Sequence, residues 1–226
     1  MSECEILSTH DEARETTGKF MTHRLFVSIC FLTLLHAASY SQPQRVGWWK
    51  FDDTTNILAP QPGYGNPLQL VGSHQVAQGP SSGNFAVRIG VGSNYKMRHM
   101  IQPNGGGTRV NQFTLQFDFK VPALGIWHAF FQTNIANVTD GDCFINPAGN
   151  IGVGETGYSE YAISAGEWYR LVISVANGSF YRYYLDGQLL HAGTARPIDG
   201  RFSLDSLLLP FADEDGEDGL IDIAEV

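Results

Sequence analysis

Apolar and polar residues alternate over residues 112–121, QFTLQFDFKV, and this period of two constrains the fold more than any other feature. The residues of one face are Phe113, Leu115, Phe117, Phe119 and Val121. Because successive side chains of a β-strand point to opposite faces, this stretch predicts a strand with one buried and one solvated face. No helical periodicity of similar length follows residue 42. The chain is therefore expected to be all-β.

Two turn dipeptides divide the later stretch of residues 168–190, WYRLVISVANGSFYRYYLDGQLL. Asn177-Gly178 and Asp186-Gly187 are strong hairpin signals, since both tolerate the positive φ of tight turns. They predict three consecutive antiparallel strands. Further short apolar runs predict strands at residues 45–51, 68–71, 85–89, 127–132, 143–145, 150–153, 201–209 and 220–226. A dozen short strands without crossover helices predict one antiparallel two-sheet β-sandwich of jelly-roll type, spanning residues 42–226.

The first 41 residues predict export rather than a folded domain. Residues 21–41 combine a short basic start, an apolar run and a small-residue end, which is the order of a secretory signal peptide. Residues 1–20 are polar and acidic, so we interpret them as a leader with a mis-assigned start, and Met21 as the initiator. A cytoplasmic stub on an anchor helix is the alternative. A cleaved signal predicts a secreted or cell-surface protein with no stable membrane span and, of three cysteines, only Cys143.

The charge balance argues against several classes of partner. The chain has 14 Lys and Arg against 23 Asp and Glu, a net charge of −9, and no basic stripe. Recognition of nucleic acids or anionic membranes requires clustered basic residues. The glycine-rich stretch of residues 102–110, QPNGGGTRV, lacks the Lys-Ser/Thr pair and the following helix of a phosphate loop. We therefore expect neither nucleic acid nor a nucleotide cofactor.

Three motifs in order resemble the laminin-G-like jelly rolls of the concanavalin A-like lectin and glucanase superfamily. They are an opening VGWWKFDD, a central Trp-Tyr strand leading to a Tyr-x-Asp-Gly hairpin, and a closing IDIAEV. The matching residues are Trp49, Phe51, Asp52, Trp168, Tyr169, Tyr184, Asp186, Gly187, Ile221, Asp222, Glu225 and Val226. The resemblance implies a non-catalytic recognition or adhesion module for a glycan or an extracellular protein. It also implies that the closing strand continues beyond Val226, in a longer multi-domain protein.

Two other functions are compatible with the same resemblance. Glucanases of this superfamily carry Glu-x-Asp-x-x-Glu, and aligning Asp222 and Glu225 with its last two positions places Leu220 at the nucleophile. A retaining glycosidase needs two carboxyl groups flanking the scissile bond, so Leu220 argues against hydrolysis. The remaining alternative is a structural spacer of a larger secreted enzyme.

The acidic stretch of residues 213–218, DEDGED, raises the question of calcium. Ca²⁺ prefers six to eight oxygen ligands, and Asp213, Asp215 and Asp218 are candidates, although the stretch does not match an EF-hand. Family resemblance implies instead a Ca²⁺ ion between the opening and closing strands, held by Asp52 or Asp53 and by Asp222. A solvated acidic turn whose carboxylates bind their own backbone is the alternative.

Exposed aromatic residues are the other candidates for ligand contact, because lectin-like domains stack sugars on them. Because side chains alternate along a strand, one of the adjacent residues Trp48 and Trp49 should point to solvent. We expect Trp48 to be this residue and a candidate ligand contact. Tyr64, Tyr95 and Tyr158 in predicted loops are further candidates.

Overall fold

The computed structural model describes residues 44–226, so the predicted leader and signal peptide lie outside the described residues. The described part contains fourteen strands and no α-helix, and every pairing between these strands is antiparallel. Within it, no segment meets the length and hydropathy that a membrane-spanning helix requires. The predicted all-β fold is confirmed.

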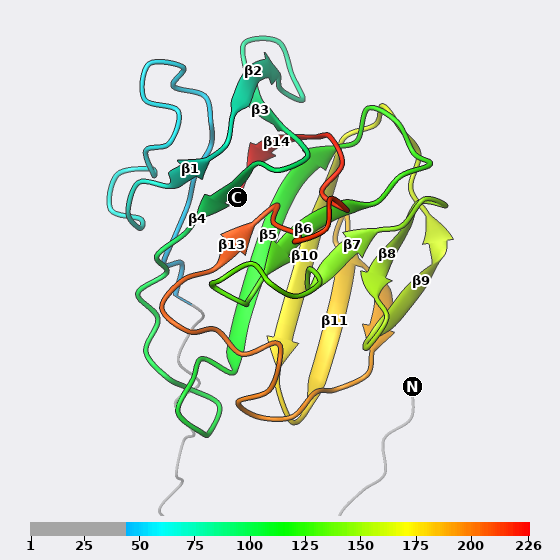
Figure 1. Ribbon diagram of the computed structural model, residues 1–226. Helices are drawn as coiled ribbons and strands as arrows, with labels where there is room; N and C mark the ends of the chain where they lie inside the picture. The colour runs from blue at the N-terminus through cyan, green and yellow to red at the C-terminus, as the bar shows by residue number, and fades with distance from the viewer. Residues whose placement is uncertain (1–43) are drawn as a thin grey trace, which may run out of the picture. The chain divides into compact units, whose positions relative to one another are not determined.

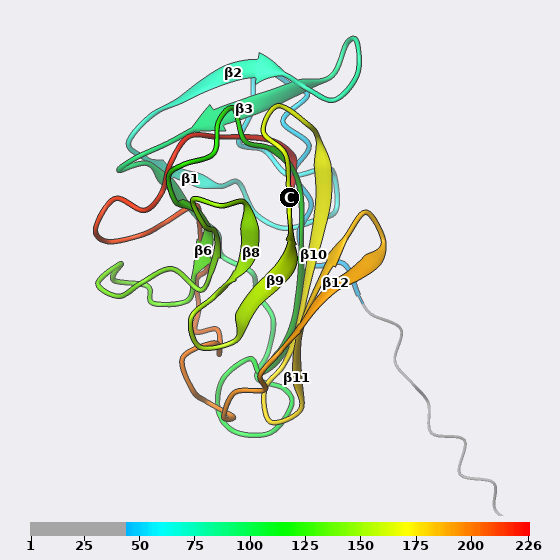
Figure 2. The same cartoon turned by 90° about the vertical axis from the view of Figure 1, so that its right-hand side faces the viewer.

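The larger sheet has seven strands. In spatial order they are β12 (Gln188–Gly193), β11 (Phe180–Leu185), β10 (Tyr169–Ala176), β5 (Gln112–Lys120), β14 (Ile221–Glu225), β3 (Phe85–Ile89) and β2 (His74–Gln78). The three consecutive strands expected around the two turn dipeptides are β10, β11 and β12 (Figure 1 for β10 and β11, Figure 2 for all three).

The second layer is built from a five-stranded and a two-stranded sheet. The five strands are β13 (Leu209–Pro210), β6 (His128–Gln132), β7 (Cys143–Ile145), β8 (Asn150–Val153) and β9 (Gly157–Ala162). The two-stranded sheet pairs β1 (Gln69–Val71) with β4 (Asn94–Lys96), and the bridge between Met97 and Leu208 joins it to β13. Seen edge-on, β6, β8 and β9 form one layer and β10 with β11 the other (Figure 2).

The alternation of β5 explains the packing between the layers. Phe117 and Phe119 are fully buried and both contact Phe130 of β6, with ring centroids 5.3 Å and 4.9 Å away. The Phe119 pair has an edge-to-face geometry, the arrangement that the quadrupoles of aromatic rings favour. The apolar face of β5 thus forms the centre of the sandwich core.

The two hairpin turns differ in form. Asp186 and Gly187 both have positive φ, 49° and 82°, as a two-residue type I′ turn requires. In the other hairpin Ala176 pairs with Phe180, so three residues form the loop and only Gly178 among them has positive φ, 83°. Asn177 instead turns its side chain inward, donating to Asn111 Oδ1 and Ser203 Oγ.

Backbone pairing between Trp49 and Val226 closes the sandwich. Trp49 N donates to Val226 O at 2.8 Å, and Val226 N donates to Trp49 O at 2.9 Å. This pairing is confined to one residue, so residues 45–51 do not form the strand that we predicted. Residues 201–208 likewise form a loop that leads into β13, with isolated bridges at Leu204 and Leu208. The prediction also missed β2, β4 and β9, whose apolar residues are few or do not alternate.

Candidate binding surface

An open hollow lies between four segments at one end of the second layer. Its volume is about 710 Å³, and its lining comes from Arg109, Thr133, Asn134, Ile135, Thr139, Asp140, Arg201, Asp205 and Glu214. These residues belong to the segment before β5, the β6–β7 loop, the segment before β13 and the acidic loop after β13. We call this feature the loop hollow.

Arg201 joins the loops that surround the loop hollow. Its Nε donates to Asp142 Oδ1 at 2.8 Å, and its Nη2 donates to the carbonyl oxygens of Asp140 and Gly141 at 2.9 and 2.8 Å. Its Nη1 also pairs with Glu155, in the turn between β8 and β9. Charge-assisted hydrogen bonds to several partners hold the guanidinium in one orientation, so Arg201 is a rigid part of the wall.

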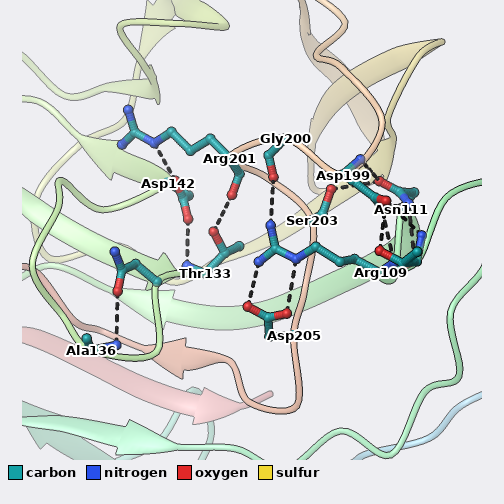
Figure 3. A network of polar contacts seen from close by, with 12 residues as sticks. Arg109, Asn111, Thr133, Ala136, Asp142, Asp199, Gly200, Arg201, Ser203 and Asp205 are labelled. Carbon is teal, nitrogen blue, oxygen red and sulfur yellow. Dashed lines mark hydrogen bonds and ion pairs between the residues drawn. The ribbon is translucent and has the colours of Figure 1, made fainter.

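Asp142 is the buried partner in this network. Its side chain is 1% exposed, and its second carboxylate oxygen accepts a hydrogen bond from Thr133 N at 2.6 Å (Figure 3). Burial raises the pKa of Asp142 to about 6, although Thr133 and Arg201 favour the ionised form. Asp142 is therefore an internal support for the hollow and does not line it.

Arg109 forms the opposite wall with Asp205. Arg109 Nε and Nη2 donate to the two carboxylate oxygens of Asp205 at 3.1 and 2.8 Å, and Nη1 donates to Gly200 O at 3.2 Å (Figure 3). The bidentate pair fixes the plane of the guanidinium. The side chains of Arg109 and Asp205 remain 27% and 50% exposed, so both can reach a ligand.

Asp199 anchors the base of the Arg109 segment. Its carboxylate accepts hydrogen bonds from Thr108 N at 2.7 Å, Arg109 N at 3.0 Å and Asn111 Nδ2 at 2.9 Å. The hydrogen bond from Asn111 is the largest of the effects that lower the pKa of Asp199 to about 2. The segment before β5 is thus tied to the loop before β13 by an ionised carboxylate.

The acidic loop forms the third side of the hollow, and Asp213 shapes it. Asp213 Oδ2 accepts from Glu217 N at 2.9 Å and Asp215 N at 3.3 Å, which closes the loop on itself. Asp213 Oδ1 accepts from Gly141 N at 3.0 Å, which attaches the acidic loop to the β6–β7 loop. Glu214 is left exposed at the hollow.

Part of the predicted calcium ligand set does come together in this loop. Asp213, Asp215 and Glu217 each offer a carboxylate oxygen, and these oxygens lie within 4.8 Å of one another. The prediction named two of the three and missed Glu217. Asp218 has a separate role, because it is buried and accepts a hydrogen bond from Gly92 N at 2.8 Å.

Neighbouring carboxylates contribute to the raised pKa values of Asp215 and Glu217. For Asp215 the leading cause is the hydrogen bond with Asp213, and for Glu217 it is burial, with the charges of Asp215 and Asp213 next. A cation among these groups would relieve the repulsion and lower the same pKa values. The geometry is compatible with the predicted metal and equally with the solvated turn.

The structure corrects the other half of the calcium prediction. Asp222 is fully buried, and its carboxylate pairs with Arg88 at 2.6 and 2.9 Å and with Lys120 at 3.3 Å. Asp52 instead accepts from Phe85 N at 3.0 Å. Phe85 and Arg88 are three residues apart on β3, about 10 Å along an extended strand. Asp222 is an ion-pair residue and does not share a metal with Asp52.

Asp53 is not part of the carboxylate cluster found among residues 44–226. It is exposed, and its carboxylate accepts hydrogen bonds from Thr55 Oγ1 at 2.6 Å and Thr55 N at 3.0 Å. The side-chain bond from Thr55 is the main cause of its lowered pKa. Asp53 is a local turn residue.

Among the predicted ligand-contact aromatics, Trp48 and Tyr64 lie together. Their ring centroids are 5.5 Å apart and nearly perpendicular, and Tyr64 is 36% exposed. Arg45 and Lys50 lie over the Trp48 ring at 4.5 and 5.0 Å. As predicted, Trp48 is the more exposed of the adjacent pair, because Trp49 is only 2% exposed. The two cations compete with any sugar for the faces of the Trp48 ring.

The other two tyrosines are less accessible. Tyr95 is fully buried, packs against Phe51 at 6.1 Å and has its hydroxyl 2.7 Å from His74 Nδ1, so its selection as a surface residue was wrong. Tyr158 is half-buried beside Trp127, at a ring distance of 6.1 Å, and burial raises its pKa to about 12.

The arginines of the loop hollow were missed by sequence reasoning. Arg109 and Arg201 stand alone in the sequence, 92 positions apart by number, and match no motif. The hollow presents guanidinium, carboxylate, amide and hydroxyl groups, and no His, Cys or Ser is among its lining residues. Such a surface can hydrogen-bond a polar ligand.

No family model matches the sequence, and no curated protein matches it at a significant level. Solved structures do share the fold. One is domain 4 of AbnA, a GH43 extracellular arabinanase from Geobacillus stearothermophilus, in complex with arabinotriose. It is 20% identical, with a TM-score of 0.55 over 80% of this chain and 90% of that domain.

Receptor-binding domains of botulinum neurotoxins are also similar. The C/D mosaic domain is 14% identical with a TM-score of 0.56, and the type G domain is 10% identical with a TM-score of 0.55. The matches cover 79% and 81% of this chain but only 46% and 47% of the neurotoxin domains, so this chain spans about half of their length. At these identities the comparisons establish a shared β-sandwich fold.

Proposed function

We propose that this protein is an exported, non-catalytic recognition module that binds a glycan in the loop hollow. The observation that carries the proposal is the arrangement of two arginines and several carboxylate, amide and hydroxyl groups around one open volume of about 710 Å³. Internal ion pairs already orient these groups, so little side-chain entropy is lost on binding.

The charges of the lining favour a neutral sugar over an anionic one. Asp140, Asp205 and Glu214 carry three negative charges, and Arg109 and Arg201 carry two positive charges. A ligand rich in hydroxyl groups can donate to the carboxylates and accept from the guanidinium groups. An anionic ligand would meet unneutralised carboxylates without compensation.

Two further considerations support a binding module. The motif order resembles laminin-G-like domains, and the arabinanase domain with the same fold was solved with arabinotriose. The carboxylates of IDIAEV are engaged elsewhere, Asp222 with Arg88 and Glu225 with Gln116 Nε2 at 3.2 Å. We therefore propose recognition rather than glycoside hydrolysis.

Calcium would have a supporting role in this proposal. Asp213, Asp215 and Glu217 would hold a Ca²⁺ ion that stiffens the acidic loop beside the hollow. Glycan binding would then depend partly on Ca²⁺, because Glu214 of the same loop lines the hollow.

A glycan array of neutral and uronic-acid oligosaccharides, followed by calorimetry on the hits, tests the proposal. Ile135→Trp should fill the hollow and weaken binding about tenfold or more. Val138→Trp is the matched control, since Val138 is 66% exposed in the same loop but does not line the hollow. Equal affinity in both variants would refute the assigned site. Release of shorter sugars from a hit would indicate a glycoside hydrolase instead.

A further inference from the structure

The outer edge of β2, at one end of the large sheet, has no paired strand among the described residues. β2 is the last strand of the sheet and pairs only with β3, in a regular register from His74 opposite Ile89 to Gln78 opposite Phe85. It is the outermost strand in both views (Figures 1 and 2). The other sheet edges in the described part of the chain are protected in different ways.

The other edges are protected by register shifts, by their short length or by a neighbouring strand. β12 contains a register shift and lies against β9, which closes one side of the sandwich. β9 also has a register shift, and β1 and β13 have only three and two residues. Natural proteins use such devices, or charges and prolines, to prevent edge-to-edge pairing. β2, with the sequence HQVAQ, has none of them.

The backbone of β2 shows which groups are free. Gly79 N donates to Asn84 O at 3.0 Å, so these two residues form a hydrogen-bonded pair. Such pairs alternate along an antiparallel ladder, so Gln75 and Ala77 bond to β3. The N–H and C=O groups of His74, Val76 and Gln78 therefore point away from the sheet. Within residues 44–226, no backbone hydrogen bond reaches them from that side.

The side chain of Val76 adds an apolar component to this edge. Val76 is 50% exposed, whereas its neighbour across the ladder, Val87, is fully buried. Opposite residues lie on the same face of a sheet, so Val76 extends the core-facing row of the large sheet beyond the body of the sandwich.

We propose that β2 pairs antiparallel with β2 of a second copy of this chain, on a twofold axis through Val76. In this register Val76 faces the copy's Val76, and His74 faces the copy's Gln78. All three outward residues then pair, and the two exposed valines cover each other. The strand is uncharged, so the pairing opposes no like charges, and a closed twofold contact ends the association at a dimer.

A second copy satisfies this edge better than an unrelated peptide does. The outward residues are placed symmetrically about Val76, so one register completes both strands at once. Pairing between the β2 strands of two copies covers both edges without a different partner protein. No open strand then remains to promote aggregation.

Sedimentation equilibrium of the full chain over a wide concentration range tests the association. We expect a concentration-dependent dimer that Val76→Lys weakens by about tenfold or more, because two lysines would face each other on the axis. Val91→Lys is the control, since Val91 is 67% exposed outside the strand. A monomer at every concentration, or equal loss in both variants, would overturn the proposal.

Disulfide trapping tests the register independently of any folding defect. In a hydrogen-bonded pair the Cα atoms are about 5.5 Å apart, within the range that a disulfide spans. With Cys4 and Cys30 changed to Ser and Cys143 buried, Val76→Cys should give a cross-linked dimer under mild oxidation, whereas Val91→Cys should not. A dimer that persists in solution but fails to cross-link through residue 76 would place the interface elsewhere.

Discussion

Asp222 and Arg88 form a bidentate ion pair across β14 and β3, with Asp222 fully buried and Arg88 37% exposed. The two residues are opposite each other in the strand register, although 134 positions separate them in the sequence. Lys120, from the other neighbouring strand, also contacts Asp222 and lies over the ring of Trp168 at 5.0 Å. One carboxylate thus links three adjacent strands of the large sheet, β5, β14 and β3.

Removal of Arg88 should destabilise the fold. Breaking a buried ion pair costs about 3–5 kcal/mol, and we expect Arg88→Met to fall near the lower limit, because Lys120 still compensates Asp222. Urea unfolding measures the change. Arg170→Met is the control, since the Arg170–Asp118 pair is 51% and 18% exposed and should contribute less than about 1 kcal/mol. Equal losses would contradict the role of burial.

The acid limb of the stability curve should depend on Asp199. Its pKa in the folded state is lowered to about 2 from 3.8, so the unfolded chain takes up the proton first as the pH falls. The stabilisation from Asp199 is complete above about pH 4 and is lost as the pH falls towards 2. Unfolding of Asp199→Asn at a series of pH values should therefore show a deficit at pH 7 that shrinks below pH 4. A deficit independent of pH would refute this assignment; Asp140→Asn, at an exposed carboxylate, is the control.

Millimolar Ca²⁺ should raise the midpoint of thermal unfolding relative to excess EDTA. A ligand that binds only the folded state stabilises it by about 2.7 kcal/mol at a hundredfold excess over its dissociation constant. Asp215→Asn should abolish the shift, because Asp215 is exposed and belongs to the three-carboxylate cluster. Asp53→Asn, at an exposed carboxylate outside the cluster, should retain it. The absence of any shift in the unchanged protein would favour the solvated turn.

Gly219 should not accept a larger residue. A Cβ atom there would lie 2.4 Å from Trp127 O and 2.7 Å from Ile126 Cδ1, and Gly219 N donates to the same Trp127 oxygen at 2.9 Å. Backbone cannot move aside as a flexible side chain can, so Gly219→Ala should cost about 1–3 kcal/mol in urea unfolding. Gly154→Ala is the control, because nothing lies within 4 Å of a Cβ there. Equal stability of the two variants would show that the end of the acidic loop can shift.

Local pattern was sufficient to predict most of the strands. The alternation in β5 and the turn dipeptides on either side of β11 depend on neighbours in the chain, and the structure has these elements where we expected them. β2 was missed because its five residues contain one alternating apolar side chain, Val76, at the margin of the core. An edge strand buries little, so its pattern is weak.

Alternation and turn chemistry act over a few residues, so they were sufficient to predict an all-β sandwich. The roles of the candidate residues depend instead on contacts between distant segments. Asp213 meets Gly141 across 72 positions, Asp222 meets Arg88 rather than a metal, Tyr95 is buried, and Arg109 and Arg201 converge on one hollow. The residues next to a carboxylate or a tyrosine in the sequence do not indicate its environment in the fold. Its role depends on which distant segments the packing of the two layers brings against it.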